Sequence, residues 1–190
     1  MSEFWDAEAA TFDDEPDHGL RDPASRAAWL QLLTAHLPPP PARVADLGCG
    51  TGTLSVLLAE AGYAVDGVDF APEMVARARA KAAGLAGVTF TVADASAPPL
   101  EAGAYDAVLC RHVLWALPDR AAVVERWVEL LARDGRLLLV EGDWHTGAGL
   151  TAAATEALLR AAGRAPTTYP LEDEAYWGGP ITDERYLVVG

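Results

Sequence analysis

The segment from Arg43 to Leu54, R-V-A-D-L-G-C-G-T-G-T-L, places one acid and three glycines at alternate positions. Asp46 is followed by Gly48, Gly50 and Gly52, and leucines at helical spacing begin directly after them. Glycine lets the backbone take positive φ and approach a ligand closely, while the free N–H groups of a new helix face that ligand. The pattern therefore predicts a strand, a tight turn and a helix that together bind a compact polar ligand.

Other polar side chains stand at or just beyond the ends of further apolar segments. Asp69 ends the second segment and Asp94 follows the third, while Arg111-His112 follows the fourth and His145 follows the fifth. In an open parallel sheet, ligands bind at the carboxyl ends of the strands, near the point where the strand order reverses. We therefore expect these side chains to line one crevice.

The elements that must position these residues alternate between strands and helices. Strands are expected at 44–47, 63–69, 88–92, 105–110 and 136–140, and shorter ones at 165–169 and 184–189. Helices are expected to begin at Thr53, Pro72, Pro118 and Thr151, the third with Val123, Val124, Trp127 and Leu131 on its buried side. This rhythm predicts right-handed βαβ units, and hence an α/β fold with a doubly wound, mostly parallel sheet of seven strands and a short C-terminal part.

A length of 190 residues fits one domain with a sizeable core. Asp22-Pro23 is typical of a helix start, with Asp as N-cap and Pro at the first helical position, and Leu30, Leu33 and Leu37 mark an apolar face. The acidic and aromatic residues before this helix indicate a short helix and a loop that fold onto the rest of the chain. We expect an N-terminal cover segment at 1–22 and a single domain at 23–190.

Composition narrows the classes of function. The net charge of −14 argues against a nucleic-acid partner, because neutralising phosphates requires a basic surface. It favours a small neutral or cationic substrate, with solubility alone as the alternative reason for the acidity. No apolar run approaches the roughly 20 residues of a membrane span, and the N-terminus is acidic, so a cytoplasmic protein without a membrane partner is expected. Cys49, Cys110 and the histidines lack the close spacing of a zinc site, so no metal is predicted.

Two ligand classes use a glycine turn of this kind. The dinucleotide fingerprint G-x-G-x-x-G needs its third glycine where Thr53 stands, so that pattern fails. The sequence instead resembles motif I of the class I methyltransferases that use S-adenosylmethionine, D-x-G-x-G-x-G, with Asp46, Gly48, Gly50 and Gly52 in all four places. The resemblance spans roughly residues 29–140, and other segments look like features of a bacterial small-molecule subgroup.

This resemblance implies S-adenosylmethionine as cofactor and S-adenosylhomocysteine as product. Asp69 lies where an acid accepts both ribose hydroxyls, Phe70 and Met74 are expected to flank the adenine, and Asp94 with Ala95 resembles the pair that binds the adenine edge. The full expected cofactor set is Asp46, Gly48, Cys49, Gly50, Gly52, Asp69, Phe70, Met74, Asp94, Ala95 and Arg111.

The methyl acceptor is expected to lie between residues 1–22, His112, Trp144 and the loop that contains Trp177. Methyl transfer from a sulfonium depends mainly on alignment in a dry site, and a general base matters only where the acceptor loses a proton. His112, His18 and His145 are the candidates for that base, with polar wall residues as the alternative interpretation. Trp115 and Trp144 are candidates for aromatic walls. Core packing is the alternative for both, and it is the stronger one for Trp115, which is followed by Ala116-Leu117.

Two other functions compete with methyl transfer. A nicotinamide-dependent oxidoreductase would share the sheet, but Thr53 and the missing Tyr-x-x-x-Lys pair speak against it. A protein that binds S-adenosylmethionine as a sensor or scaffold, without catalysis, would share the cofactor site. Such a sensor or scaffold would bind the cofactor without turnover, and the path to the methyl group would be obstructed.

Overall fold

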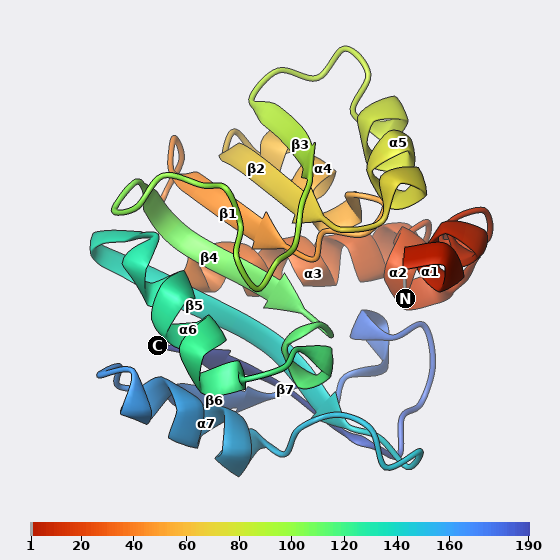
Figure 1. Cartoon of the computed structure of the whole chain (residues 1–190). Helices are drawn as coiled ribbons and strands as arrows, with labels where there is room; N and C mark the ends of the chain where they lie inside the picture. The colour runs from red at the N-terminus through yellow and green to blue at the C-terminus, as the bar shows by residue number, and fades with distance from the viewer. Residues whose placement is uncertain (1) are drawn as a thin grey trace.

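A seven-stranded sheet forms the centre of the protein in the computed structural model, which describes residues 2–190 (Figure 1). Its spatial order is β3-β2-β1-β4-β5-β7-β6. All neighbouring strands run parallel except β7, which is antiparallel to β5 and β6, so the predicted mostly parallel sheet is confirmed. The strands are β1 Arg43–Leu47, β2 Ala64–Asp69, β3 Val88–Val92, β4 Tyr105–Arg111, β5 Leu131–Asp143, β6 Thr167–Pro170 and β7 Glu184–Val189.

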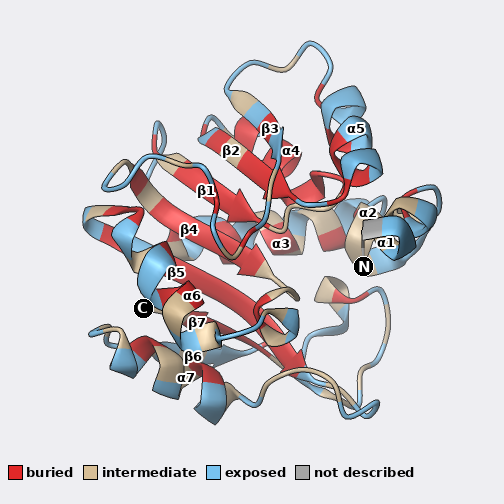
Figure 2. Ribbon diagram, viewed as in Figure 1, coloured by how far each residue is buried: buried red, intermediate tan, exposed pale blue. Residues whose placement is uncertain are grey.

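Helices cover both faces of the sheet, and the central strands are buried between them (Figure 2). Helices α3 (Pro23–His36) and α4 (Thr53–Glu60) cover one face, and α5 (Pro72–Lys81) packs beside α4 at the β3 edge. Helices α6 (Arg120–Glu129) and α7 (Ala152–Ala161) cover the other face. Successive strand residues point to opposite faces, so Leu138 meets the α3 and α4 layer, whereas Leu137 and Leu139 meet the α6 and α7 layer.

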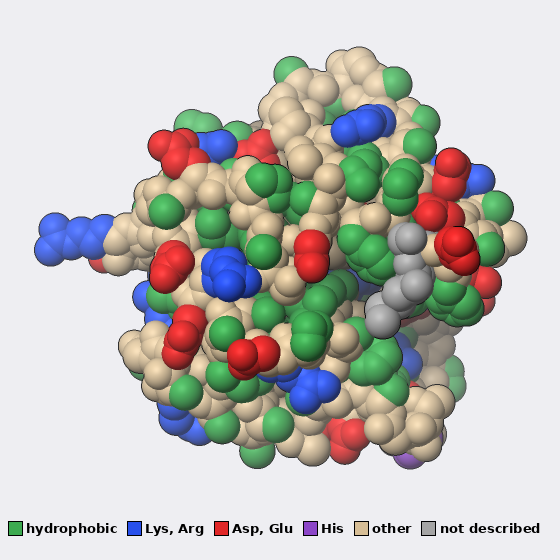
Figure 3. All heavy atoms as spheres, viewed as in Figure 1, with side chains coloured by type: hydrophobic (Ala, Val, Ile, Leu, Met, Phe, Trp, Pro, Cys, Tyr) green, Lys and Arg blue, Asp and Glu red, His purple; other side chains and the backbone are tan. Residues whose placement is uncertain are grey.

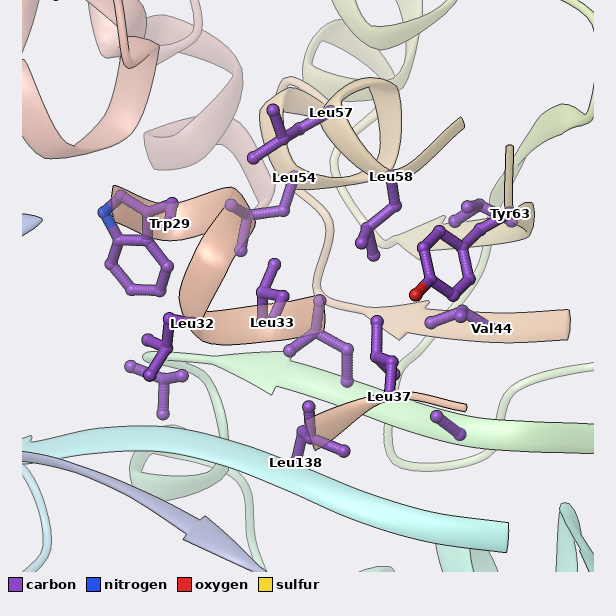
Figure 4. Close-up of a cluster of buried hydrophobic side chains, with 14 of the residues drawn as sticks. Trp29, Leu32, Leu33, Leu37, Val44, Leu54, Leu57, Leu58, Tyr63 and Leu138 are labelled. Atoms are coloured by element: carbon purple, nitrogen blue, oxygen red, sulfur yellow. The ribbon is translucent and has the colours of Figure 1, made fainter. Parts of the chain in front are cut away.

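Helix α3 begins where its sequence predicts. The Asp22 carboxylate accepts a hydrogen bond from the Ala24 N–H at 3.1 Å, and Pro23 occupies the first turn. Its buried side differs slightly from the expected leucine face, because Trp29 and Leu32 are buried whereas Leu30 is only partly buried. Trp29, Leu32 and Leu33 pack with α4 leucines over the strands (Figure 4).

Helix α6 begins and ends at different residues from those expected. It starts at Arg120, two residues after Pro118, because the Asp119 side chain caps it by accepting from the Ala122 N–H at 3.4 Å. It ends at Glu129, and Leu131 is the first residue of β5, opposite Tyr105, instead of a buried helical residue. The register between β4 and β5 then shifts before Arg136 pairs with Ala107, so β5 begins five residues before the expected strand at 136–140 and contains a bulge.

The N-terminal segment folds onto the domain as helix α1 (Ser2–Glu8), the 3-10 turn η1 (Phe12–Asp14) and the short helix α2 (Pro16–Gly19). Met1 lies outside the described residues. Helix α1 contacts α5, where the Asp6 carboxylate accepts from the Glu73 N–H at 3.0 Å. Two further 3-10 turns, η2 (Leu114–Ala116) and η3 (Glu174–Tyr176), follow β4 and precede β7. Among residues 2–190, no helix combines the length and the apolarity that crossing a bilayer requires.

Charged side chains of both signs lie on the face of the molecule that Figure 3 shows. On the face in Figure 3, Lys and Arg side chains lie singly among acidic ones. The described residues contain no group of three or more His, Cys, Asp or Glu side chains that could hold a metal ion.

Candidate active site

A cavity opens at the carboxyl ends of the parallel strands, where the strand order reverses between β1 and β4. The fold brings the predicted cofactor residues together here, with one exception. Those that line the cavity are Asp46, Gly48, Cys49, Gly50, Asp69, Phe70, Met74, Asp94, Ala95 and Arg111. Gly52 is the exception.

The glycine turn adopts the left-handed backbone that its sequence predicts. Gly48 and Gly50 have φ of +76° and +55°, and a Cβ at Gly48 would lie 2.4 Å from Cγ2 of Val113. Gly52 has φ of +75°, and a Cβ there would lie 2.8 Å from Cβ of Ala78 and from Cζ of Phe90. Gly52 therefore allows α4 to pack against α5 and β3 instead of lining the cavity, and the two earlier glycines form the cavity floor.

Asp46 lies beneath this turn and is buried. Its Oδ2 accepts a hydrogen bond from Oγ of Ser55, on α4, at 2.5 Å. Burial raises the pKa of Asp46 to about 6, against the opposing effects of Ser55 and Arg111. Asp46 thus joins the end of β1 to the helix that follows the turn.

Asp69 ends β2 and contacts the glycine turn from the neighbouring strand. Its Oδ2 accepts from the Gly50 N–H and its Oδ1 from the Ala71 N–H, both at 2.9 Å. Burial raises the pKa of Asp69, and these N–H groups oppose the shift. Each carboxylate oxygen has a second lone pair, so the group can accept further hydrogen bonds from a hydroxyl pair of a ligand.

The end of the cavity at β3 is more open. Asp94 is exposed and accepts from the Ser96 N–H at 2.8 Å, so it caps a local turn as well as lining the cavity. Met74 is buried, whereas Phe70 has 37% of its surface exposed. An apolar pair beside an acid, open to solvent, fits a flat heterocycle that carries an amino group.

Arg111 connects the end of β4 to the N-terminal segment. Its Nη1 donates to the Asp17 carbonyl at 2.7 Å, and its guanidinium lies 5.0 Å from the Trp29 ring centroid. Desolvation lowers the pKa of Arg111, and the nearby Asp17 and Asp46 act in the opposite direction. This cation therefore joins the N-terminal segment to the end of β4.

A hydrogen-bonded contact fixes the same segment at the glycine turn. Asp13 accepts from Oγ1 of Thr51 at 2.5 Å and pairs with Nζ of Lys81 at 2.9 Å. Lys81 also donates to Oγ1 of Thr53 at 2.6 Å. Trp5, Phe12 and His18 of the segment line the cavity.

A second, more open hollow of about 710 Å³ adjoins the cavity, within the size range of small-molecule sites. Both are lined by Trp5, His18, His112 and Trp115, so these four residues mark the junction between them. Trp144, Trp177 and Arg185 line the hollow but not the cavity. The expected acceptor residues from 1–22, His112, Trp144 and the Trp177 loop thus surround one space.

His112 stands at the junction in a left-handed backbone with φ of +59°. Its ring lies edge-on to Trp144 at 5.2 Å and stacks on Trp177 at 5.8 Å between centroids. The buried Nε2 has no hydrogen-bond partner in the described chain. Desolvation, together with Arg111, Arg185 and His18, lowers the pKa of His112 well below its ordinary value, so the ring is neutral at pH 7.

The other two candidate histidines differ in their surroundings. His18 stacks on Phe12 at 4.2 Å, and its buried Nδ1 has no hydrogen-bond partner among residues 2–190. His145 has an exposed side chain, with Nε2 3.0 Å from Asp183 and 2.9 Å from Oγ1 of Thr182. It lines neither the cavity nor the hollow, because the chain turns outward after Trp144.

Three features of the site are absent from the sequence-based set. The Asp13–Thr51–Lys81 contact joins residues far apart in the chain, and no local pattern predicts it. Buried Glu141, on β5, accepts from the N–H groups of Val113 and Leu114, and so holds the turn that carries His112. Arg185 was predictable in principle, since an antiparallel last strand brings its first residues to the carboxyl edge of its parallel neighbours.

Comparison with known proteins gives concordant matches. A family model described as "Methyltransferase domain" matches residues 45–139. A ubiquinone biosynthesis O-methyltransferase of Xanthomonas axonopodis pv. citri (strain 306) is 36% identical over 139 residues, which is 72% of this chain and 54% of that protein. The chain therefore spans about half the length of the curated relatives it matches.

Solved structures share the fold. The magnesium protoporphyrin IX methyltransferase of Synechocystis PCC 6803, crystallised with bound S-adenosylmethionine, aligns with a TM-score of 0.68 and 28% identity over 86% of this chain and 76% of that one. A putative methyltransferase complexed with the Haloferax volcanii Trm112 activator aligns with a TM-score of 0.73 over 98% and 96%. At 22% identity, the second match shows the fold alone.

Proposed function

Since the chain belongs to the methyltransferase-domain family, we propose that it is an S-adenosylmethionine-dependent methyltransferase that acts on a small-molecule acceptor. The observation that carries this proposal is the junction between the cavity and the hollow. A donor in the cavity and an acceptor in the hollow meet where Trp5, His18, His112 and Trp115 line both spaces. Two adjoining spaces with these four residues in common favour catalysis over a sensor or scaffold that only binds the cofactor.

The residues of the cavity fit this cofactor. Asp46, Asp69 and Asp94 bring negative charge to a molecule that carries a sulfonium and an ammonium group against one carboxylate. The left-handed Gly48 and Gly50 allow close approach to the turn, and Asp69 is placed to accept the ribose hydroxyls. Phe70 and Met74 flank the adenine, with Asp94 and the Ala95 backbone at its edge.

When bound, S-adenosylmethionine supplies an electrophilic methyl group, and its methyl–sulfur bond breaks as the bond to an acceptor oxygen, nitrogen or carbon forms, which leaves S-adenosylhomocysteine. The contribution of the protein is alignment and the exclusion of water. Trp5 and Trp115 wall the junction, and the contact of Asp13 with Thr51 keeps the cover segment over it. Where the acceptor must lose a proton, His112 is the first candidate to receive it and His18 the second, because both line the cavity and the hollow.

Calorimetry with S-adenosylhomocysteine tests the cofactor site. Replacing Asp69 by Ala removes hydrogen bonds to a charged group and should weaken binding by about 1.5–3 kcal/mol. Asp134→Ala is a matched control, because Asp134 is exposed in the bulge at the amino end of β5, and it should leave the affinity unchanged. Equal affinities for both variants would remove the ribose assignment.

A second measurement separates this proposal from its rivals. Titration with NAD under the same conditions should show no binding, since Thr53 occupies the place of the third fingerprint glycine. Incubation with S-adenosylmethionine and mixed acceptors should release S-adenosylhomocysteine, detected by mass spectrometry. Tight cofactor binding without turnover on any acceptor would indicate a sensor or scaffold instead.

A further inference from the structure

One side of the junction between the cavity and the hollow comes from a short segment, residues 112–117, which contains the 3-10 turn η2. His112 and Trp115 line both spaces, and Val113 lines the cavity. A Cβ at Gly48 would lie 2.4 Å from Cγ2 of Val113, so the same segment packs directly on the glycine turn. A change in the path of these few residues would therefore alter both spaces together.

The two ends of this turn are bound by side chains from other elements. A turn this short leaves N–H groups at its start and carbonyl groups at its end without partners of its own. At the start, Oε1 of Glu141 accepts from the N–H groups of Val113 at 3.2 Å and Leu114 at 2.8 Å. At the end, Nε of Arg120 donates to the Trp115 carbonyl at 3.1 Å, and its Nη2 donates to the same oxygen. A carboxyl group on β5 and a guanidinium at the first residue of α6 thus hold the turn between them.

The segment has a backbone conformation that needs such support. His112 has φ of +59°, a left-handed value that is costly for a residue with a side chain and persists where surrounding contacts enforce it. The Trp115 indole N–H donates to the His112 carbonyl at 3.0 Å, which links the two residues that line both spaces. Glu141 binds the N–H groups directly after His112, and Arg120 binds the carbonyl of Trp115 itself. These two side chains therefore restrain the positions of His112 and Trp115.

We propose that Arg120 and Glu141 are positioning residues for methyl transfer, which set the places of His112 and Trp115 at the junction by holding the two ends of η2. This inference rests on the methyltransferase function proposed above. Neither Arg120 nor Glu141 is among the described residues that line the cavity or the hollow, so both act through the turn. Loss of either contact should loosen the cavity wall and move the Trp115 ring.

Calorimetry with S-adenosylhomocysteine measures the first consequence. Arg120→Gln should weaken binding at least about fivefold, because a wall of the cavity loses hydrogen bonds from a charged group. Arg164→Gln is the matched control, since Arg164 is also partly buried and also donates to a backbone carbonyl, that of Gly135 at 2.6 Å, away from both spaces. It should leave the affinity unchanged.

Circular dichroism measures the second consequence without any ligand. The Trp115 and Trp144 rings lie 5.6 Å apart between centroids at an interplanar angle of 70°. Two indole rings at this separation couple their electronic transitions, which produces a pair of far-ultraviolet bands of opposite sign. Trp115→Phe removes this pair, so its difference spectrum against the wild type defines the signal. Arg120→Gln should lose most of that signal, and Arg164→Gln should keep it.

Variants of Glu141 separate positioning from general stability. Glu141→Gln keeps an accepting oxygen and should preserve both the affinity and the dichroism signal, whereas Glu141→Met, of similar length without that oxygen, should lose both. Thr155→Val is a destabilised control, because it removes a buried hydrogen bond to the Tyr186 hydroxyl at 2.8 Å on α7. It should lower the melting temperature and change neither readout. If Glu141→Met does not fold, the partly exposed Arg120 still decides the outcome.

Four outcomes would count against the assignment. An unchanged dichroism signal in Arg120→Gln would show that the Trp115 ring stays in place without this contact, and an unchanged affinity would show that the turn does not matter to the donor. Equal impairment in Glu141→Gln and Glu141→Met would remove the role of the accepting oxygen. A loss of affinity in Thr155→Val as large as that in Arg120→Gln would reduce the effect to general stability. Failure of the wild type to bind S-adenosylhomocysteine would instead refute the proposed function, and the dichroism comparison would still test the turn.

Discussion

Replacing Glu141 by Gln tests how the structure holds the turn that carries His112. Glu141 is completely buried on β5, and its Oε1 accepts from the Leu114 N–H at 2.8 Å and the Val113 N–H at 3.2 Å. Its Oε2 has no hydrogen-bond partner in the described part of the chain. Burial raises the pKa of Glu141 to about 8, in opposition to the backbone N–H groups of the turn. The native protein therefore holds this side chain protonated at neutral pH.

The sign of the effect on stability follows from this shift. The unfolded chain releases the Glu141 proton near pH 4.5, and the folded protein releases it near pH 8. Stability from this group is therefore complete below about pH 4.5 and is lost as the pH rises toward 8. Each pH unit within the window costs about 1.4 kcal/mol, so the wild type should lose about 2–3 kcal/mol between pH 5 and pH 7. Gln does not ionise, and Glu141→Gln should avoid this loss.

Urea unfolding at pH 5, 6 and 7, followed by tryptophan fluorescence, measures the difference between wild type and variant. Subtracting the two curves cancels the other titrating groups, including Asp46. Glu125→Gln on α6 is the control, since Glu125 is exposed and its replacement should leave the pH dependence unchanged. Parallel curves for wild type and Glu141→Gln would show that Glu141 is ionised in the folded protein and would refute the reasoning.

Two further predictions concern the junction and its cover. His112→Gln should lower kcat by about 100-fold or more with an acceptor that must lose a proton, while the affinity for S-adenosylhomocysteine changes less than about twofold. Equal turnover rates of the variant and the wild type would show that His112 is only a wall residue. Asp13→Asn weakens the contact with Thr51 and Lys81, so stopped-flow fluorescence should show S-adenosylhomocysteine leaving about 5–10 times faster. Asp14→Asn, which breaks only an exposed ion pair with Arg21, should leave the dissociation rate unchanged. A similar acceleration in this variant would show that the contact of Asp13 with Thr51 and Lys81 does not retain the ligand.

Local sequence patterns were sufficient to predict the central part of the fold and the glycine turn of the cavity. The run from Asp46 to Gly52 predicted a strand, a left-handed turn and a helix. This was possible because the positive φ that favours glycine is a property of the local backbone. The alternation of strands and helices predicted the parallel sheet, and the expected fold and family resemblance are confirmed. Since parallel strands end at one edge, Asp69 and Asp94 could be placed on the same cavity from sequence alone.

Contacts between distant segments could not be predicted in this way. Gly52 lies in the motif but serves the packing of Ala78 and Phe90, which depends on how closely α5 and β3 approach it. His145 follows a strand like the other candidates, yet the loop after Trp144 turns it toward Asp183 and solvent. Strand position indicates which edge a residue reaches, but the path of the following loop decides where its side chain points.

The sequence by itself determined the cavity at the glycine turn, because this side of the protein is built from short segments whose backbone conformation depends on adjacent residues. Only the tertiary structure decided the adjoining hollow. Arg185, Trp177 and the cover segment come from opposite ends of the chain and meet through packing on β4 and β5. Side-chain packing of this kind depends on the summed shape of the whole core, and no local spacing encodes it.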